Sequence, residues 1–282
     1  MVEGPLIESN GRIRMKATVF LGAGRITSAL VAGLHLAGYT RPIVVYDRNQ
    51  QKLLALGRAL PIDPVHDLAT AVERAEMLIV AVQPASVADL LDEVARCGFT
   101  PPALAVSLAA GVPLRNLRTR LKPPVRWARA MPSPVCRIGR GLTALAFEPA
   151  LASLARKKVR EFFSYVGSVI DLPENSFDAF TATFSSTHGY HALATLAKAA
   201  EDAGIDRKTS LMAAAHALAD GILYWRESKK NVAELLHEAT TPGGTAAATM
   251  QSMDKAGYAK VIARGLQAGM AQARRNAGKK RS

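Results

Sequence analysis

The chain has 282 residues, of which 49% are hydrophobic, and its formal net charge is +13 at pH 7. This length allows two domains with buried cores. Charged residues interrupt every apolar stretch before it reaches the roughly 20 residues that a membrane-spanning helix needs. The only cysteines, Cys97 and Cys136, lack the spacing of a metal or redox motif, which favours the reducing cytoplasm. Residues 1–16 contain acids and no long apolar run, which predicts a disordered lead-in rather than a secretory signal.

The positive charge is spread over several segments rather than gathered on one predicted surface. Five basic residues lie in a C-terminal tail over residues 274–282, and eight more lie between residues 115 and 140. Few aromatic residues stand among them, although a surface that stacks bases would need such residues. We therefore expect no specific nucleic-acid partner and no membrane partner. We expect the charge to attract small anions, such as a dinucleotide or a carboxylate.

Residues 17–47 have the pattern of a dinucleotide-binding βαβ unit. An apolar run, a glycine turn, a helical pattern, a second apolar run and an acid follow one another along this stretch. Gly22 permits the tight strand-to-helix turn, and Gly24 lets a pyrophosphate approach the N–H groups of the following helix. Arg25 and Ile26 begin that helix, and we expect them to contact the cofactor as well. The alternative is an ordinary tight turn in another kind of α/β protein.

The end of the second apolar run carries two neighbours that favour different cofactors. Asp47 can accept a hydrogen bond from the ribose 2′-hydroxyl of NADH, whereas Arg48 can pair with the 2′-phosphate of NADPH. These two residues leave the choice between NADH and NADPH open.

Strand and helix patterns alternate up to residue 171. Further apolar strands are expected at residues 77–82, 103–107, 125–130, 142–147 and 166–170, with helices at 50–60 and 86–96. Continuous apolar strands that alternate with helices are typical of a doubly wound parallel sheet. We expect an α/β fold in which residues 17–171 form a Rossmann-type dinucleotide-binding domain.

After residue 171 the pattern is helical throughout. Ala, Leu and Met recur at helical spacing in residues 177–203, 207–229, 231–238, 246–255 and 258–273. This pattern predicts an all-α domain over residues 172–273 that binds substrate and forms a dimer. Its apolar faces are too extensive for one small helical unit to cover, so we expect a homodimer or a higher homo-oligomer.

Several segments resemble the Δ1-pyrroline-5-carboxylate reductase family, from Val19 to about Ala273. The two most specific are residues 129–132, Arg-Ala-Met-Pro, which resemble the family's Arg-x-Met-Pro, and residues 240–245, Thr-Thr-Pro-Gly-Gly-Thr, which resemble its Cys-Ser-Pro-Gly-Gly-Thr. Ala-Val-Gln-Pro at 81–84 and Ser-Leu-Ala-Ala-Gly-Val at 107–112 are similar to two further family segments. The resemblance implies reduction of Δ1-pyrroline-5-carboxylate to L-proline with NADPH or NADH, in a homodimer whose C-terminal halves interleave.

The resemblance also implies which residues bind the ligands. For the cofactor they include Ala81, Val82, Gln83, Pro84, Ala109 and Ser133, besides the glycine turn and the strand end. For the substrate they are Thr241, Gly243, Gly244, Thr245 and Ala246, in a loop whose exposed N–H groups precede a helix and can hold a carboxylate. From the residues alone, this loop can also be an ordinary proline–glycine turn with a threonine helix cap.

Reduction of a C=N bond also requires a proton for the nitrogen. Thr181 is retained from the family pattern, and we take it as a candidate catalytic residue. His188 departs from the pattern, but its unperturbed pKa of about 6.5 suits proton donation. The alternative is that His188 and His191 lie on an exposed helix face. No carboxylate or cysteine stands at a supporting spacing, so we expect no metal site.

Three departures from the family pattern affect the predicted substrate. Ser133 replaces an asparagine, Ala246 replaces a threonine, and residues 184–189 differ from the family segment at most positions. They leave two alternatives open. One is a reductase of another cyclic imine or ketimine acid, and the other is a non-catalytic regulatory protein that binds a dinucleotide.

Overall fold

The computed structural model describes residues 6–7, 13–14, 16–98 and 103–278. The chain divides into two compact units: a first unit of residues 1–184 and 269–282, and a second unit of residues 185–268. The last strand in the described part of the chain ends at Asp171, where the sequence places the change from strands to helices. The division between the compact units falls later, after Phe184.

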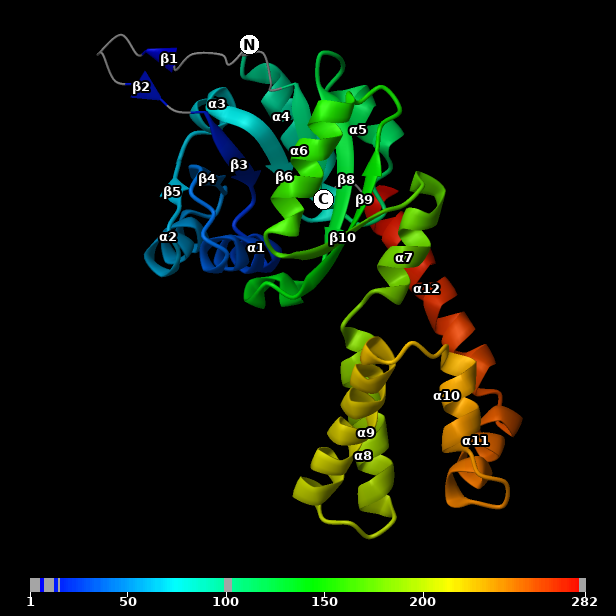
Figure 1. The fold of residues 1–282 in the computed structure, drawn as a ribbon. Helices are drawn as coiled ribbons and strands as arrows, with labels where there is room; N and C mark the ends of the chain where they lie inside the picture. The colour runs from blue at the N-terminus through cyan, green and yellow to red at the C-terminus, as the bar shows by residue number, and fades with distance from the viewer. Residues whose placement is uncertain (1–5, 8–12, 15, 99–102, 279–282) are drawn as a thin grey trace. The chain divides into compact units, whose positions relative to one another are not determined.

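An eight-stranded sheet forms the centre of the first unit (Figure 1). The strands are β3 (Ala17–Leu21), β4 (Ile43–Tyr46), β5 (Asp63–Pro64), β6 (Ala75–Val80), β7 (Leu104–Ser107), β8 (Arg126–Pro132), β9 (Gly141–Phe147) and β10 (Gly167–Asp171). Their spatial order is β10-β9-β8-β7-β6-β3-β4-β5. The chain runs outward from β3 to β5 and then returns to place β6 on the other side of β3. In an open α/β sheet, ligands bind at the carboxyl ends of the strands where the order reverses in this way.

All neighbouring strands of this sheet are parallel except β8 and β9. The two antiparallel strands are joined by the short 3-10 helix η2 (Pro134–Ile138). A parallel crossover needs a dozen or more residues, so this connection can only turn the chain back. The Rossmann-type α/β fold expected from the sequence is confirmed, with one antiparallel pair in its sheet.

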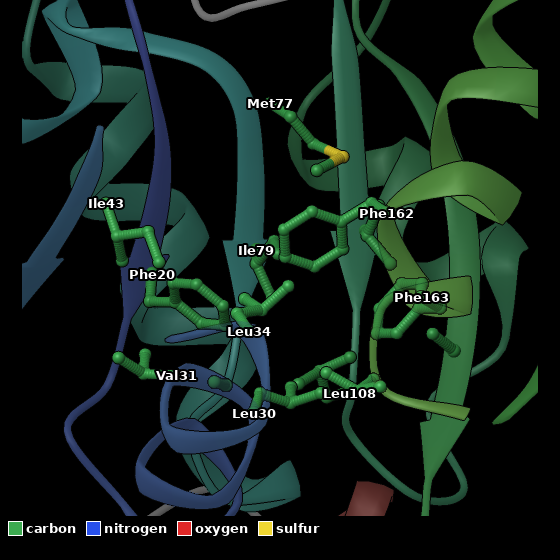
Figure 2. Packing of buried hydrophobic residues seen from close by; sticks show 14 of the residues in the cluster. Phe20, Leu30, Val31, Leu34, Ile43, Met77, Ile79, Leu108, Phe162 and Phe163 are labelled. Carbon is green, nitrogen blue, oxygen red and sulfur yellow. The ribbon is translucent and has the colours of Figure 1, made fainter. Parts of the chain in front are cut away.

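Helices cover both faces of the sheet. On one face lie α1 (Arg25–Leu36), α2 (Gln50–Ala59) and α6 (Ser153–Ser164), and on the other lie α3 (Leu68–Glu73), α4 (Val87–Arg96) and α5 (Leu114–Arg120). A hydrophobic core lies on each face of the sheet, and every β3 side chain is buried. Phe20 lies in the core beneath α1, α2 and α6, whereas Val19 and Leu21 lie in the core beneath α3, α4 and α5. Figure 2 shows Phe20 with Leu34 of α1 and Phe162 of α6.

The predicted helix over residues 177–203 is two helices, α7 (Phe177–Thr183) and α8 (Thr187–Asp202). Ser185 lies between them, and its hydroxyl oxygen accepts the Thr187 N–H at 3.4 Å. Side chains of this kind compete with the helical hydrogen-bond pattern. The sequence patterns also predict none of α3, α5 and α6, which are short or rich in charged residues.

The two ends of the chain differ in part from the sequence-based expectation. β1 (Leu6–Ile7) pairs antiparallel with β2 (Ile13–Arg14), where the sequence predicts a disordered lead-in; residues 1–5, 8–12 and 15 lie outside the described residues. In the expected basic tail, Arg274 and Arg275 belong to α12 (Tyr258–Gly278), and residues 279–282 lie outside the described part.

The second unit is helical and buries few of its side chains. It consists of α8, α9 (Arg207–Glu227), α10 (Val232–Ala239), α11 (Thr245–Lys255) and the first part of α12. Within residues 185–268, all of them described, only Ala197, Ser210 and Ala214 are buried. None of the described helices has the length and apolarity needed to cross a membrane.

Candidate functional site

The glycine turn joins the carboxyl ends of three strands. Gly22 has a φ of +120°, and a Cβ there would lie 2.7 Å from the carbonyl oxygen of Ala81, so only glycine fits. Its N–H donates to the carbonyl of Tyr46 at 2.7 Å, which holds the turn against the end of β4. The buried Thr27 hydroxyl donates to the Gly22 carbonyl at 2.6 Å and braces the turn from α1.

The second glycine of the turn leaves space open above α1. Gly24 is the N-cap of α1, no side chain caps the helix, and no acid stands in its first turn. A Cβ built on Gly24 meets no atom within 4 Å. The uncapped N–H groups of a helix N-terminus bind anions such as a pyrophosphate. The turn therefore fits a dinucleotide.

Asp47 fastens the glycine turn to the end of β4. Its Oδ2 accepts the Ala23 N–H at 2.7 Å, and its Oδ1 accepts the Asn49 N–H at 2.7 Å. Each carboxylate oxygen thus already receives a backbone hydrogen bond. This adds a structural role to the ribose-binding role predicted from the sequence.

A hollow of about 490 Å³ opens at the carboxyl ends of β3, β4 and β6. Seven of the predicted cofactor residues line it: Gly22, Gly24, Asp47, Arg48, Ala81, Val82 and Gln83. Sequence reasoning missed Tyr46, Asn49, Lys52, Ser86 and Leu90, which line it as well. Arg25 lines an adjoining hollow of about 510 Å³, which shares Gly24 and Lys52 with the first.

The remaining four predicted cofactor residues, Ile26, Pro84, Ala109 and Ser133, line neither hollow. Ser133 is buried, and its hydroxyl oxygen accepts the Val135 N–H at 3.1 Å as the cap of η2. Ala109 is buried too, and its N–H donates to the Ser107 hydroxyl oxygen at 3.3 Å. Both residues therefore hold local backbone structure at the ends of β7 and β8.

The hollow holds more positive than negative side chains. Arg48 donates to Glu93 at 2.5 Å, and this hydrogen bond raises the pKa of the guanidinium. Lys52 lies in the first turn of α2, one turn along from the N-cap Asn49, and lines both hollows. Two cations against one carboxylate already bound to backbone N–H groups give a site suited to phosphate.

The predicted proton-donating residues lie in different units. Thr181 is in α7 of the first unit, and its hydroxyl donates to the Phe177 carbonyl at 2.7 Å. His188 is exposed in the first turn of α8, in the second unit.

The described residues contain no group of three or more His, Cys, Asp or Glu side chains arranged to hold a metal ion.

The predicted substrate loop forms the N-terminus of α11. Gly243 has a φ of +77°, and the Gly244 N–H donates to the Thr241 carbonyl at 2.9 Å, which closes a tight turn. Gly244 is the N-cap, no side chain caps α11, and no acid stands in its first turn. Thr241, Thr245 and Ala246 are exposed. The loop thus presents a helix N-terminus that can receive a carboxylate.

The fold and the open glycine turn define a protein that binds a dinucleotide. Residues 18–111 match the family model "NADP oxidoreductase coenzyme F420-dependent", and residues 174–276 match "Pyrroline-5-carboxylate reductase dimerisation". A pyrroline-5-carboxylate reductase of Methanosarcina acetivorans is 30% identical over 242 residues, covering 84% of this chain and 89% of that relative. The chain therefore belongs to the pyrroline-5-carboxylate reductase family.

Another relative supports this assignment, and two solved structures share the fold. A pyrroline-5-carboxylate reductase of Mycobacterium tuberculosis is 28% identical over 281 residues, covering 90% of this chain and 94% of the relative. The fold is similar to a Plasmodium falciparum pyrroline carboxylate reductase with NADP bound, with a TM-score of 0.82, 17% identity and coverage of 94% and 100% of the two chains. A reductase of Streptococcus pyogenes gives a TM-score of 0.83 at 21% identity, with coverage of 93% and 99%.

These comparisons confirm three predictions made from the sequence. The family resemblance is confirmed, as is the class of enzyme, an NAD(P)-dependent oxidoreductase that acts on a C=N bond. The cofactor is confirmed as a nicotinamide dinucleotide, NADPH or NADH.

Proposed function

We propose that the protein reduces Δ1-pyrroline-5-carboxylate to L-proline with NADPH or NADH. The observation that carries the proposal is the 30% identity to a pyrroline-5-carboxylate reductase over 84% of the chain. Two open helix N-termini support it, one at Gly24 of α1 and one at Gly244 of α11. The reaction needs both an anionic dinucleotide and a substrate carboxylate, and each N-terminus fits one of these groups.

In this proposal each binding group has its own role. The bound dinucleotide supplies a hydride. Gly24 and the first turn of α1 hold its pyrophosphate, and Lys52 and Arg48 attract its phosphates. The N–H groups at Gly244 and Thr245 hold the substrate carboxylate, which fixes the position of the C=N carbon. Thr181 and His188 are the proposed groups that orient or supply the proton for the imine nitrogen.

We also propose that the protein works as a homodimer built through its second unit. Many large apolar side chains of that unit are exposed, including Leu211, Met212, Ile222, Leu223 and Tyr224. A second copy that packs on these helices would bury them. The free Cys97 and Cys136 suit a reducing cytoplasm, which we propose as its location.

The second candidate is a reductase of a different cyclic imine acid, which Ala246 favours. Ala246 is exposed at the second position of α11, where the family pattern has a hydroxyl. Alanine is smaller than threonine and cannot form that hydroxyl's hydrogen bond, so a larger or differently substituted ring would be accepted more readily. Both candidates keep the carboxylate site and the dinucleotide site.

Purified protein, NADPH and a set of cyclic imine acids test the proposal directly. Oxidation of NADPH should be fastest with Δ1-pyrroline-5-carboxylate, and L-proline should accumulate in equal amount. Faster turnover of a six-membered imine acid would favour the second candidate. No oxidation with any imine acid, despite tight dinucleotide binding, would contradict both.

A further inference from the structure

Arg129 is a buried cation at the centre of the first unit. It lies on β8 with only 2% of its surface exposed. Its guanidinium lies 3.6 Å from Glu174 Oε1, 3.5 Å from Asp178 Oδ1 and 4.4 Å from the centre of the Phe177 ring. Phe177 and Asp178 begin α7, and Glu174 begins the 3-10 helix η3 (Glu174–Ser176), which leads directly into α7. Arg129 therefore faces α7 with its charged end.

The same carboxylates extend the contact to two other segments. Asp178 Oδ2 accepts the Arg274 Nε–H at 3.1 Å, from the last turns of α12. Glu174 Oε1 accepts the backbone N–H of Leu114 at 2.5 Å, at the start of α5. All of these residues belong to the first unit. One buried guanidinium thus links β8 to α7 and, through its acids, to α12 and α5.

The end of α12 is tightly packed at this place. A Cβ on Gly111 would lie 2.3 Å from the carbonyl oxygen of Ala273, so the loop after β7 touches the backbone of α12 directly. Arg274, which pairs with Asp178, is the next residue. A shift of α7 would therefore move Asp178 and disturb its hydrogen bond with Arg274 of α12.

Stability alone does not explain why a buried arginine is paired with two acids here. The Nε and Nη2 atoms of Arg129 and the Oδ1 atom of Asp178 are buried and have no hydrogen-bond partner among the described residues. Burial lowers the pKa of Arg129, and the nearby Asp178 and Glu174 oppose that shift. Replacing a buried ion pair with apolar side chains of similar volume often leaves stability unchanged or raises it.

The position of α7 matters because it carries Thr181. Thr181 follows Asp178 by three residues and so lies on the same side of the helix. Its neighbour Phe180 packs with Met131 against a small core of Ala144, Ala146 and Phe177. Met131 lies near the carboxyl end of β8. We propose that Arg129 is a positioning residue that holds α7, and with it Thr181, against that end of β8.

The catalytic consequence rests on the proposed function, whereas the structural consequence does not. Arg129→Met should therefore be compared with Arg126→Met, a control on the same strand whose side chain pairs with the buried Glu148 instead. Hydrogen exchange of residues 174–183 should rise in R129M, because the ion pairs to that segment are gone. It should stay near the wild-type rate in R126M.

Kinetics supply the second measurement. In R129M we expect kcat to fall roughly tenfold or more, because a small misplacement of a reacting group is costly. The dissociation constant of NADPH should stay within about twofold of wild type, because the glycine turn is untouched. Arg129→Lys keeps the charge and should recover part of kcat. R126M should keep kcat and the NADPH dissociation constant.

The outcomes separate this proposal from the proposed function. A wild-type protein that reduces no imine would contradict the proposed function, and the exchange measurement would still test Arg129. Unchanged exchange and kcat in R129M, or equal changes in R126M, would overturn the positioning role. If R129M does not fold, Asp178→Asn removes the pair from the other side and should raise exchange over residues 174–183 and 269–276; no rise would overturn the proposal.

Discussion

At the scale of single residues, Asp47 and Gly24 shape the proposed dinucleotide site. The sequence identifies both positions, but it assigns Asp47 to the ribose alone. In the structure the two Asp47 oxygens accept backbone N–H groups from Ala23 and Asn49. The carboxylate therefore shapes the turn that is proposed to receive the pyrophosphate, and the cations that line the hollow are Lys52 and Arg48, of which Arg48 pairs with Glu93.

Replacing Asp47 tests this structural role. Asp47→Asn keeps the size but loses the charge and one acceptor, so we expect about 1–3 kcal/mol of lost stability together with weaker NADPH binding. Denaturant unfolding measures the first effect and a fluorescence titration the second. Asp92→Asn is the control, because Asp92 makes a surface ion pair with Arg120 and should change stability little. Equal losses in the two variants would contradict the role of Asp47.

Gly24 can be tested with little risk to the fold. Its φ of −80° suits any residue, and the space above its Cα is open, so Gly24→Val should leave the melting temperature nearly unchanged. The valine would occupy the place of the pyrophosphate, and NADPH affinity should fall at least tenfold. Gly22→Ala should instead lower stability, since its Cβ would meet the Ala81 carbonyl. Normal NADPH binding by G24V would contradict the cofactor site.

At the scale of elements, the sequence predicts the strands well and their directions less well. The strands β3, β4, β6 and β7 are almost entirely buried and therefore read as continuous apolar runs, whereas the two-residue edge strand β5 (Asp63–Pro64) has no such run and is not predicted. β8 and β9 are antiparallel because the connection between them is short. The apolar pattern of either strand does not indicate this direction. Tyr46, Asn49, Lys52 and Ser86 were missed in the site because they meet only when separate strand ends and helix starts come together. The sequence singles out Arg129 as part of a family segment, but not its pairing with Glu174 and Asp178, because these acids lie more than 40 residues later, in η3 and α7.

The α11 N-terminus is the element that the proposed substrate site requires. Thr245→Val removes a hydroxyl and keeps the shape, so the KM for the imine acid should rise roughly tenfold, in line with the loss of one hydrogen bond to a charged group. NADPH affinity should not change. Thr249→Val is the control on the same helix, because the Thr249 hydroxyl donates to the Thr245 carbonyl. A change in melting temperature alone would make the loop a structural turn.

At the scale of the whole molecule, the second unit buries too few apolar side chains to be stable by itself. Ile222 and Leu223 are 57% and 54% exposed, which is unusual for large apolar residues that neighbour one another on a helix. We expect a homodimer by light scattering. Ile222→Glu with Leu223→Glu should shift it toward monomer and reduce activity. Leu36→Glu is the control in the first unit, where Leu36 is 67% exposed, and should leave the assembly unchanged. An active wild-type monomer at the 30.0 kDa chain mass would contradict this proposal.

The most direct test of the central claim follows the hydride itself. Protein supplied with NADPH deuterated at the transferred position, together with Δ1-pyrroline-5-carboxylate, should form L-proline that carries one deuterium on the former imine carbon. Mass spectrometry of the product, with G24V as the control that lacks the cofactor site, gives the answer. Deuterated proline from wild type and none from G24V is the expected result. Undeuterated proline, or NADPH oxidation without proline, would contradict direct reduction of the C=N bond by the dinucleotide bound at the glycine turn.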